Sequence, residues 1–272
     1  MVKTFQGKRS PGGLSPRAEV VRRALVALIK RVPRDCEEVA LWRSPAQNLR
    51  GYTTEQPNIS RREPASRRET MNHPLQCQCG AVKGFVSHPQ AARRTVCYCK
   101  DCQAFAHFLG RAGEVLDERG GSDVIQTLPK NVTFTQGIEA LACMRLSPKG
   151  LLRWYASCCN TPIGNTLSSP NMSFIGLVHT CLENGGKSLS DSFGPVRAYV
   201  GTESAKGDPK PKKIGLPSVL LWFVGTTLKA RLNGDYKRSP FFVADTGAPI
   251  VTPRVLSMAE RTSLVNAVLA AG

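Results

Sequence analysis

The sequence predicts a mainly β domain with added helices at its C-terminal end. Between residues 74 and 190, short apolar runs rich in β-branched residues are separated by Gly, Pro and Asn, as is typical of strands joined by turns. After residue 206 the apolar residues recur at helical spacing, and residues 257–260 form a Ser-x-x-Glu capping box. These two patterns place the strands before the helices along the chain.

The expected strands follow one another through the middle of the chain. They span residues 81–87, 123–126, 132–135, 141–146, 151–156 and 173–179. The sequence Ser-Pro-Lys-Gly at residues 147–150 predicts a turn, because each of these residue types favours turn geometry. One short helix is expected just after Cys102, and it ends at Gly110.

The C-terminal segment predicts two helices. The first spans residues 219–232 and ends before Asn233 and Gly234. The second follows the capping box, and an irregular segment rich in proline, residues 239–254, joins the two.

Positive charge is concentrated in the first quarter of the chain. The 272 residues carry a formal net charge of +17, and residues 1–70 hold 15 Lys and Arg against 7 Asp and Glu. Such an excess favours polyanionic partners. No aromatic residues are interleaved with a basic stripe, so we do not expect nucleic acid as a partner and interpret residues 1–70 as a basic, poorly ordered arm. Within it, Ser15 and Pro16 predict the start of a helix that Pro33 ends.

The sequence predicts no membrane span. The most apolar run, residues 216–228, contains Pro217 and Gly225 and is shorter than the roughly 20 residues that cross a bilayer. The chain also starts without the apolar core of a signal peptide. We therefore expect a cytoplasmic protein without a membrane partner; its oligomeric state is open.

Seven of the ten cysteines fall into three tight groups, and this grouping is the main functional signal. The groups are Cys77 and Cys79; Cys97, Cys99 and Cys102; and Cys158 and Cys159, whereas Cys36, Cys143 and Cys181 are solitary. Buried inert cysteines and disulfides are the alternatives. Neighbouring cysteines pair poorly because disulfide geometry is strict, so reduced thiolates on a metal explain the grouping best.

The spacing of the cysteines divides them into two zinc sites. A closed structural site has four protein ligands, whereas a catalytic site often has three and an open position. The Cys-x-Cys-x-x-Cys run of Cys97, Cys99 and Cys102 is the natural open site. Cys77, Cys79 and the pair Cys158 and Cys159 would form the closed site, so we expect two Zn²⁺ per chain.

Three ordered motifs resemble a known family. CQCG, CYCKDC and a last cysteine followed by Asn-Thr-Pro-Ile-Gly are similar to the glutathione-dependent formaldehyde-activating (GFA) and centromere protein V family, over about residues 74–190. The resemblance implies a β-tent fold with one structural and one catalytic zinc. It also implies carbon–sulfur lyase or synthase chemistry, which joins formaldehyde and glutathione into S-hydroxymethylglutathione. By the family pattern Cys77 and Cys79 are structural ligands, and Cys97, Cys99 and Cys102 bind the catalytic zinc.

The chain departs from the family pattern at the last motif. The family has Cys-x-x-Cys-Gly-Thr-Pro, whereas here Ala156 stands at the first cysteine and Asn160 replaces the glycine. We hypothesise that Cys158 replaces the missing ligand. The C-terminal extension also exceeds the core domain, so the resemblance implies a divergent member. Three parts result: the arm over residues 1–70, a GFA-like zinc-binding β domain over 71–200, and a C-terminal helical extension packed on it over 201–272.

These motifs favour a zinc-dependent carbon–sulfur lyase-like enzyme acting on a thiol adduct of a small aldehyde, with a small thiol such as glutathione as substrate. The open zinc would act as a Lewis acid and template. Three thiolates leave that site with one negative charge, so Lys100, Arg93 and Arg94 are candidates for binding an anionic thiol, and His107 for relaying protons.

Two other functions stay open. A non-catalytic zinc-binding interaction module could use the same fold. A nucleic-acid-binding zinc ribbon is less consistent with the sequence, because ribbons prefer two Cys-x-x-Cys knuckles and only Cys99 and Cys102 have that spacing.

Overall fold

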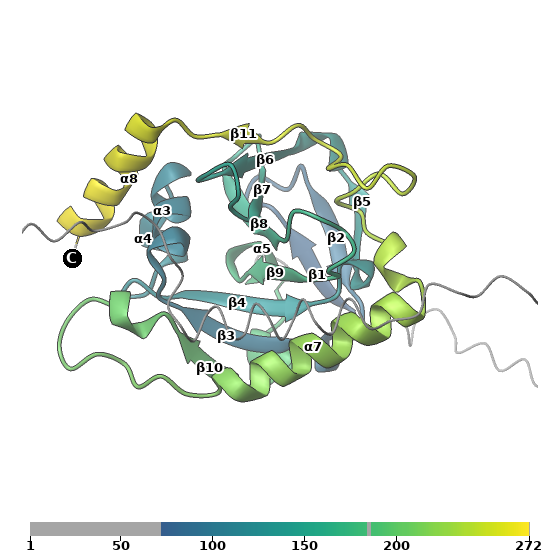
Figure 1. Ribbon diagram of the computed structural model, residues 1–272, viewed down its shortest axis with the longest axis horizontal. Coiled ribbons are helices and arrows are strands. Elements are labelled where there is room, and N and C mark those ends of the chain that lie inside the picture. Colours follow the sequence, from purple (N-terminus) through teal and green to yellow (C-terminus); the bar gives the residue numbers. More distant parts are fainter. Residues whose placement is uncertain (1–71, 184–185, 272) are drawn as a thin grey trace, which may run out of the picture. The chain divides into compact units, whose positions relative to one another are not determined.

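The structure is a computed structural model, and it describes residues 72–183 and 186–271 (Figure 1). The predicted basic arm, with its expected helix and Cys36, lies outside the described residues. The prediction of a mainly β chain with C-terminal helices is confirmed, because two sheets hold all the described strands and the longest helices follow residue 200.

The smaller sheet has three antiparallel strands in the order β1-β2-β5. The strands are β1 (His73–Gln76), β2 (Lys83–Val86) and β5 (Val132–Gln136). Gly84 lies where β2 meets β5, and a Cβ atom there would come within 2.1 Å of the carbonyl oxygen of Thr133. The close approach of these two strands therefore requires glycine at this position.

The larger sheet has eight strands in the order β10-β3-β4-β9-β8-β7-β6-β11. They are β3 (Arg93–Cys97), β4 (Ser122–Thr127), β6 (Leu141–Arg145), β7 (Leu152–Ala156), β8 (Thr161–Thr166), β9 (Ile175–Val178), β10 (Val196–Val200) and β11 (Arg254–Val255). The six inner strands pair antiparallel, whereas β10 pairs parallel with β3 and β11 pairs parallel with β6. Strands from the last part of the chain thus form both edges of this sheet.

Six α-helices accompany the two sheets in the described part of the chain. They are α3 (Lys100–Phe108), α4 (Ala112–Val115), α5 (Thr180–Glu183), α6 (Leu189–Phe193), α7 (Leu216–Leu232) and α8 (Met258–Ala270). Figure 1 shows α8 beside α3 and α7 along the β10 edge, in agreement with the contacts of these elements. None of the described helices combines the length and the apolar character that a bilayer crossing requires.

Most of the expected elements are present. The six predicted strands correspond to β2, β4, β5, β6, β7 and β9, and the predicted helix after Cys102 is α3. The capping box is also confirmed, since Ser257 accepts a hydrogen bond from the backbone of Glu260 and Glu260 accepts one from Ser257. β1, β3, β8, β10 and β11 were not predicted. The domain boundary at residue 200 stays a prediction.

An aromatic cluster joins the C-terminal segment to both sheets. Trp154 of β7 and Phe241, which follows α7, are fully buried with ring centroids 5.1 Å apart. Phe241 also meets Phe134 of β5 edge-on at 5.6 Å. The indole N–H of Trp154 donates to Thr166 on the neighbouring strand β8, so its one polar group is satisfied. The irregular segment after α7 therefore fills a gap in the main core.

We expect Phe241→Ala to lower the free energy of unfolding by about 3–5 kcal/mol, because it removes a large buried ring and leaves a cavity. Urea denaturation of the full chain measures this change. Val243→Ala, two residues away at an exposed position, is the matched control and should change stability by less than about 0.5 kcal/mol. Equal small effects for both variants would show that this segment is not part of the core.

Candidate metal centres

Cys77 and Cys79 lie on the turn that joins β1 to β2. The turn closes through hydrogen bonds from the backbone N–H of Gly80 to Cys77 and of Cys77 to Val82, and Gly80 has the positive φ of 77° that glycine adopts without strain. The sulfur of Cys77 accepts the backbone N–H of Val82 at 3.2 Å. Burial raises the pKa of this thiol, and the hydrogen bond from Val82 opposes that rise because it places a donor against the charged sulfur.

Cys158 and Cys159 lie on the turn between β7 and β8. The turn passes through Asn160, whose φ of 55° is in the left-handed region. Asparagine is among the few residues other than glycine that enter this region readily. Asn160 therefore takes the left-handed position of this turn without the strain that a bulkier residue would meet there. Ala156, just before this turn, is fully buried on β7 and pairs with Leu141 and Thr161.

The two turns bring four sulfur atoms together. The sulfur of Cys77 lies 3.6 Å from that of Cys79 and 3.9 Å from that of Cys158, and the sulfurs of Cys79 and Cys158 are 3.2 Å apart. Cys159 completes the group with its sulfur 3.8 Å from Cys158. Tetrahedral zinc with bonds of about 2.3 Å requires sulfur atoms about 3.8 Å apart. The four-sulfur group thus fits one tetrahedral ion, with adjacent cysteines both turned toward it.

The remaining three clustered cysteines form a separate group at the start of α3. Cys97 ends β3, Cys99 caps α3, and Cys102 lies in its first turn. The sulfur of Cys97 is 3.3 Å from that of Cys99 and 3.7 Å from that of Cys102. All three side chains are half-buried. The structure therefore separates the seven cysteines into the groups of four and three that the sequence predicts, and both groups could hold a metal ion.

The loop after β10 holds the three-sulfur group in place. Gly201 lies so close to Cys99 that a Cβ atom would come within 2.8 Å of its backbone nitrogen. The backbone N–H of Tyr98 donates to Val200, and the side chain of Gln103 donates to the carbonyl oxygens of Tyr98 and Ser204. These contacts fix the backbone around all three cysteines before any ion binds.

Arg153 interacts with Cys102 of the three-sulfur group, and the sequence did not indicate this residue. Its side chain is only 2% exposed, donates to Asn165 at 3.1 Å and lies 3.7 Å from the carboxylate of Asp101. The guanidinium carbon stands 5.4 Å from the ring centroid of Phe105. Three thiolates and one Zn²⁺ carry one net negative charge, which a buried arginine can balance.

The thiols within each group ionise unequally. Hydrogen bonds from Cys97 and Cys99, together with the charge of Arg153, hold the pKa of Cys102 well below its usual range in spite of burial. The hydrogen bond with Cys102 raises the pKa of Cys99 to about 11. In the four-sulfur group burial opposes ionisation of Cys159, but hydrogen bonds from Thr161 and Cys79 outweigh it and lower the pKa of this thiol to about 6. Each group therefore has one favoured thiolate.

The basic residues that the sequence favoured have other surroundings. Arg94 is paired with Asp123 at 2.6 Å, Arg93 donates to the carbonyl of Ala92, and Lys100 is exposed at the first position of α3. His107 lies in the last turn of α3, where burial and then the charge of Lys206 lower its pKa. No described histidine belongs to either sulfur group. The sequence does not indicate the role of Arg153, because the alternation of side chains along a strand predicts that an arginine between Leu152 and Trp154 faces solvent.

The other cysteines of the described chain are isolated. Cys143 and Cys181 are buried in the main core, and the thiol of Cys181 donates to the carbonyl of Val178 at 3.2 Å. Burial raises the pKa of both thiols, which for Cys143 reaches about 12. They have the environment of inert core residues.

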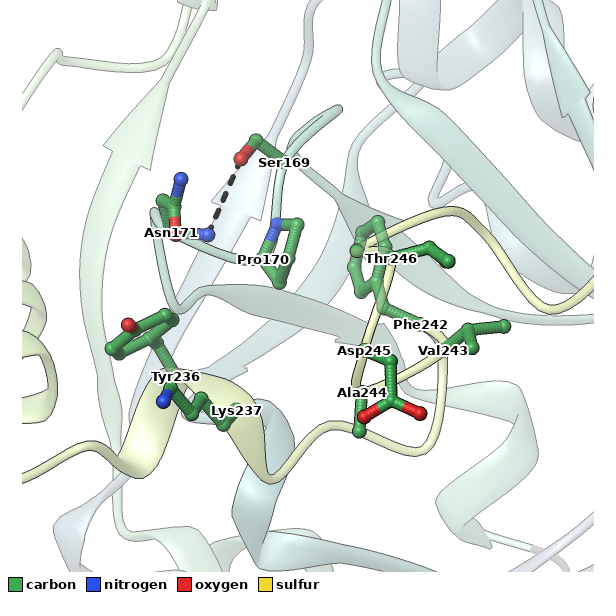
Figure 2. Close-up of a pocket in the computed structure, with 11 residues that line it drawn as sticks. Ser169, Pro170, Asn171, Tyr236, Lys237, Phe242, Val243, Ala244, Asp245 and Thr246 are labelled. Carbon is green, nitrogen blue, oxygen red and sulfur yellow. Dashed lines mark hydrogen bonds between the residues drawn. The ribbon is translucent and has the colours of Figure 1, made fainter.

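A cavity of about 300 Å³ is lined by residues that belong to neither sulfur group, and none of them is a cysteine (Figure 2). Tyr236, Lys237 and Asp245 line it together with the loop around Pro170. Figure 2 shows Asn171 and Ser169 joined by a hydrogen bond at its rim. None of the metal-ligating groups of the described chain lines it, so the sulfur groups are the better candidates for metal chemistry.

The comparisons with known proteins give a family without a known activity. Residues 70–252 match the model of a family of unknown function, DUF6151. The chain belongs to this family. The search of curated proteins found no match. Among solved structures, the chain is similar to a protein of Rhodobacter sphaeroides with 22% identity and a TM-score of 0.30; the match covers 45% of this chain and 96% of that one.

We expect Cys158→Ser to lower the metal content of the purified protein from two ions per chain to about one, because it removes one of four converging sulfurs. Inductively coupled plasma spectrometry of protein prepared without added metal measures this content. Cys143→Ala removes an isolated core thiol and should retain both ions. Two ions retained in Cys158→Ser would show that the centre does not use this sulfur.

We expect Arg153→Met to weaken metal binding at the three-sulfur group by about 10- to 100-fold, because a buried cation that holds a ligand sulfur is lost. Competition with a chromophoric chelator measures the affinity. Lys100→Met is the matched comparison and should bind metal as the natural protein does. The four-sulfur centre serves as an internal control for folding, and equal affinities in both variants would contradict the role of Arg153.

Proposed function

We propose that this protein is a zinc-dependent carbon–sulfur lyase-like enzyme that acts on the adduct of a small aldehyde with a thiol of the glutathione type. The observation that carries the proposal is the presence of two sulfur groups of different size, one with four sulfurs and one with three beside the buried Arg153. Four ligands saturate a tetrahedral ion, whereas three leave a position for a substrate.

The donor set supports zinc as the metal. Both groups consist of cysteine sulfur alone, and such soft, tetrahedral sites select zinc or iron–sulfur clusters over oxygen-loving cations. The four-sulfur group links the β1–β2 turn to the β7–β8 turn, which is the position of a structural ion. A zinc ion in the three-sulfur group would supply a Lewis acid and a template for a substrate sulfur or oxygen.

The residues around the three-sulfur group have complementary tasks in this proposal. Arg153 balances the negative charge of the three thiolates, and the N-terminus of α3 adds a partial positive charge at Cys99 and Cys102. An anionic thiol could therefore approach without strong repulsion. In the synthetic direction the thiol sulfur bonds to the aldehyde carbon and the thiol proton passes to the aldehyde oxygen. His107, which burial keeps neutral near pH 7, stays a candidate for relaying that proton.

We also propose that the fold is the β-tent of the GFA and centromere protein V family. The order of the three cysteine motifs supports this, as does the partition of their sulfurs into groups of four and three. In this proposal Cys158 takes the place of the cysteine that Ala156 replaces. The shift by two residues is accommodated because Asn160 preserves the left-handed turn that follows.

The test is the exchange between free and glutathione-bound formaldehyde, followed by exchange NMR with isotope-labelled formaldehyde. We expect the metal-loaded full chain to accelerate this exchange about tenfold or more over the spontaneous rate, which is a barrier lowered by at least about 1.4 kcal/mol. Cys99→Ser should return the rate to the spontaneous value while the four-sulfur centre keeps its ion.

Cys181→Ala is the matched cysteine control and should keep the acceleration, since its thiol lies in the core and belongs to neither group. No acceleration by a protein that holds both ions would contradict the enzyme proposal. That outcome would favour the second candidate, a non-catalytic zinc-binding interaction module. Acceleration with other small thiols but not with glutathione would retain the chemistry and change the substrate.

A further inference from the structure

Helix α7 carries a continuous apolar stripe on its outer face. Leu221 and Leu232 are 76% and 71% exposed, and further exposed apolar side chains follow the same line: Leu220, Val224 and Leu228. At about 100° per residue these five side chains fall within an arc of roughly 120°. A stripe of this length on one helix is an unusual surface, since most exposed apolar side chains of a folded protein are scattered singly.

The opposite face of α7 attaches the helix to the domain. Val219 and Ala230 are buried, and the ring of Phe223 meets Phe174 edge-on at 5.5 Å. The helix also contacts β10 and the short 3-10 helix Asp235–Lys237. Leu221 and Leu232, by contrast, expose most of their side chains to solvent. A Cβ atom at Gly225, beside the stripe, would meet no atom within 4 Å, so space around it is open.

The charges around the stripe all have one sign. Residues 209–234 contain five Lys and Arg and no Asp or Glu. Lys212 and Lys213 are exposed just before the helix, and Lys229 and Arg231 are exposed in its last two turns. Within the described part of the chain, none of these four takes part in an ion pair. Free cations thus precede the stripe, and near its end Lys229 lies beside it and Arg231 lies within its arc.

This charge pattern favours an anionic lipid surface over a second copy of the chain as the partner of the stripe. In a two-fold dimer through the stripe, an antiparallel arrangement would bring Lys212 and Lys213 against Lys229 and Arg231 of the second copy. A parallel arrangement would bring each pair against itself, so both dimers juxtapose like charges. An anionic lipid surface instead offers acyl chains to the leucines and phosphates to the cations on either side.

We propose that α7 docks this protein on anionic membranes, lying in the plane of the lipid surface. At about 1.5 Å per residue its 17 residues span roughly 26 Å, less than the hydrocarbon core of about 30 Å, and Pro217 and Gly225 interrupt it. Its length therefore excludes crossing but suits a surface position. The leucines enter the boundary of the acyl chains, while Lys229 and Arg231 extend to the headgroups along their aliphatic stems. This proposal is independent of the proposed function.

The test is co-sedimentation of the full chain with vesicles of phosphatidylcholine and phosphatidylglycerol in about a 2:1 ratio, against vesicles of phosphatidylcholine alone. We expect binding about tenfold or more tighter to the anionic vesicles, and weaker binding at high salt. The double substitution Leu221→Glu with Leu228→Glu should reduce this binding about tenfold or more, because it puts two anions into the stripe.

Met258→Glu with Leu269→Glu is the matched control. Both residues are exposed on α8, so the control makes the same change of net charge away from α7. It should bind vesicles within about twofold of the natural protein. If both double variants lost vesicle binding equally, the proposal would be overturned, and the binding would be due to net charge or to the basic arm. Absence of vesicle binding, or a dimer in light scattering that only the α7 variant dissociates, would overturn it as well.

Discussion

Four sulfur atoms converge where a turn of the small sheet meets a turn of the large sheet, and the backbone N–H of Gln78 donates to Thr161 across the same junction. Cys77 and Cys79 come from the small sheet and Cys158 and Cys159 from the large one, and their sulfurs lie within 4.8 Å of one another. Four thiolates at this separation repel strongly unless a cation lies between them. An ion bound by the four sulfurs would join the two sheets at this junction, and Cys77 itself belongs to the main core.

Strand β7 connects this junction with the second sulfur group. Arg153 near its start reaches the three-sulfur group, and the turn that follows Ala156 carries Cys158 and Cys159. Arg111, after α3, donates to the carbonyl of Cys159 and so gives a second link between the two regions. The two groups are therefore held by one continuous set of packed elements.

The sequence was sufficient to predict the fold class and the two cysteine groups, because strand alternation and cysteine spacing are local signals. It did not predict β8, although all six of its residues are buried. Its sequence, Thr-Pro-Ile-Gly-Asn-Thr, combines the residue types of a turn, and only the flanking strands β7 and β9 make it a strand. Arg153 was missed for a related reason, since its burial follows from contacts with Asp101, Asn165 and Phe105 that are distant in sequence. That Cys158 takes the place of a ligand at position 156 stays a hypothesis from the sequence, whereas the left-handed backbone at Asn160 is seen only in the structure.

Both edges of the large sheet are formed late in the chain, and this affects the order in which the protein can fold during synthesis. β3 receives its outer partner from residues 196–200, and β6 receives its partner from Arg254–Val255. Until those residues have left the ribosome, β3 and β6 each have one side without a strand partner, and unpaired backbone groups of this kind promote aggregation. The parallel pairing at each edge means that neither gap can be closed by a simple hairpin. Both edges of the large sheet can therefore be completed only after residues through Val255 have been made.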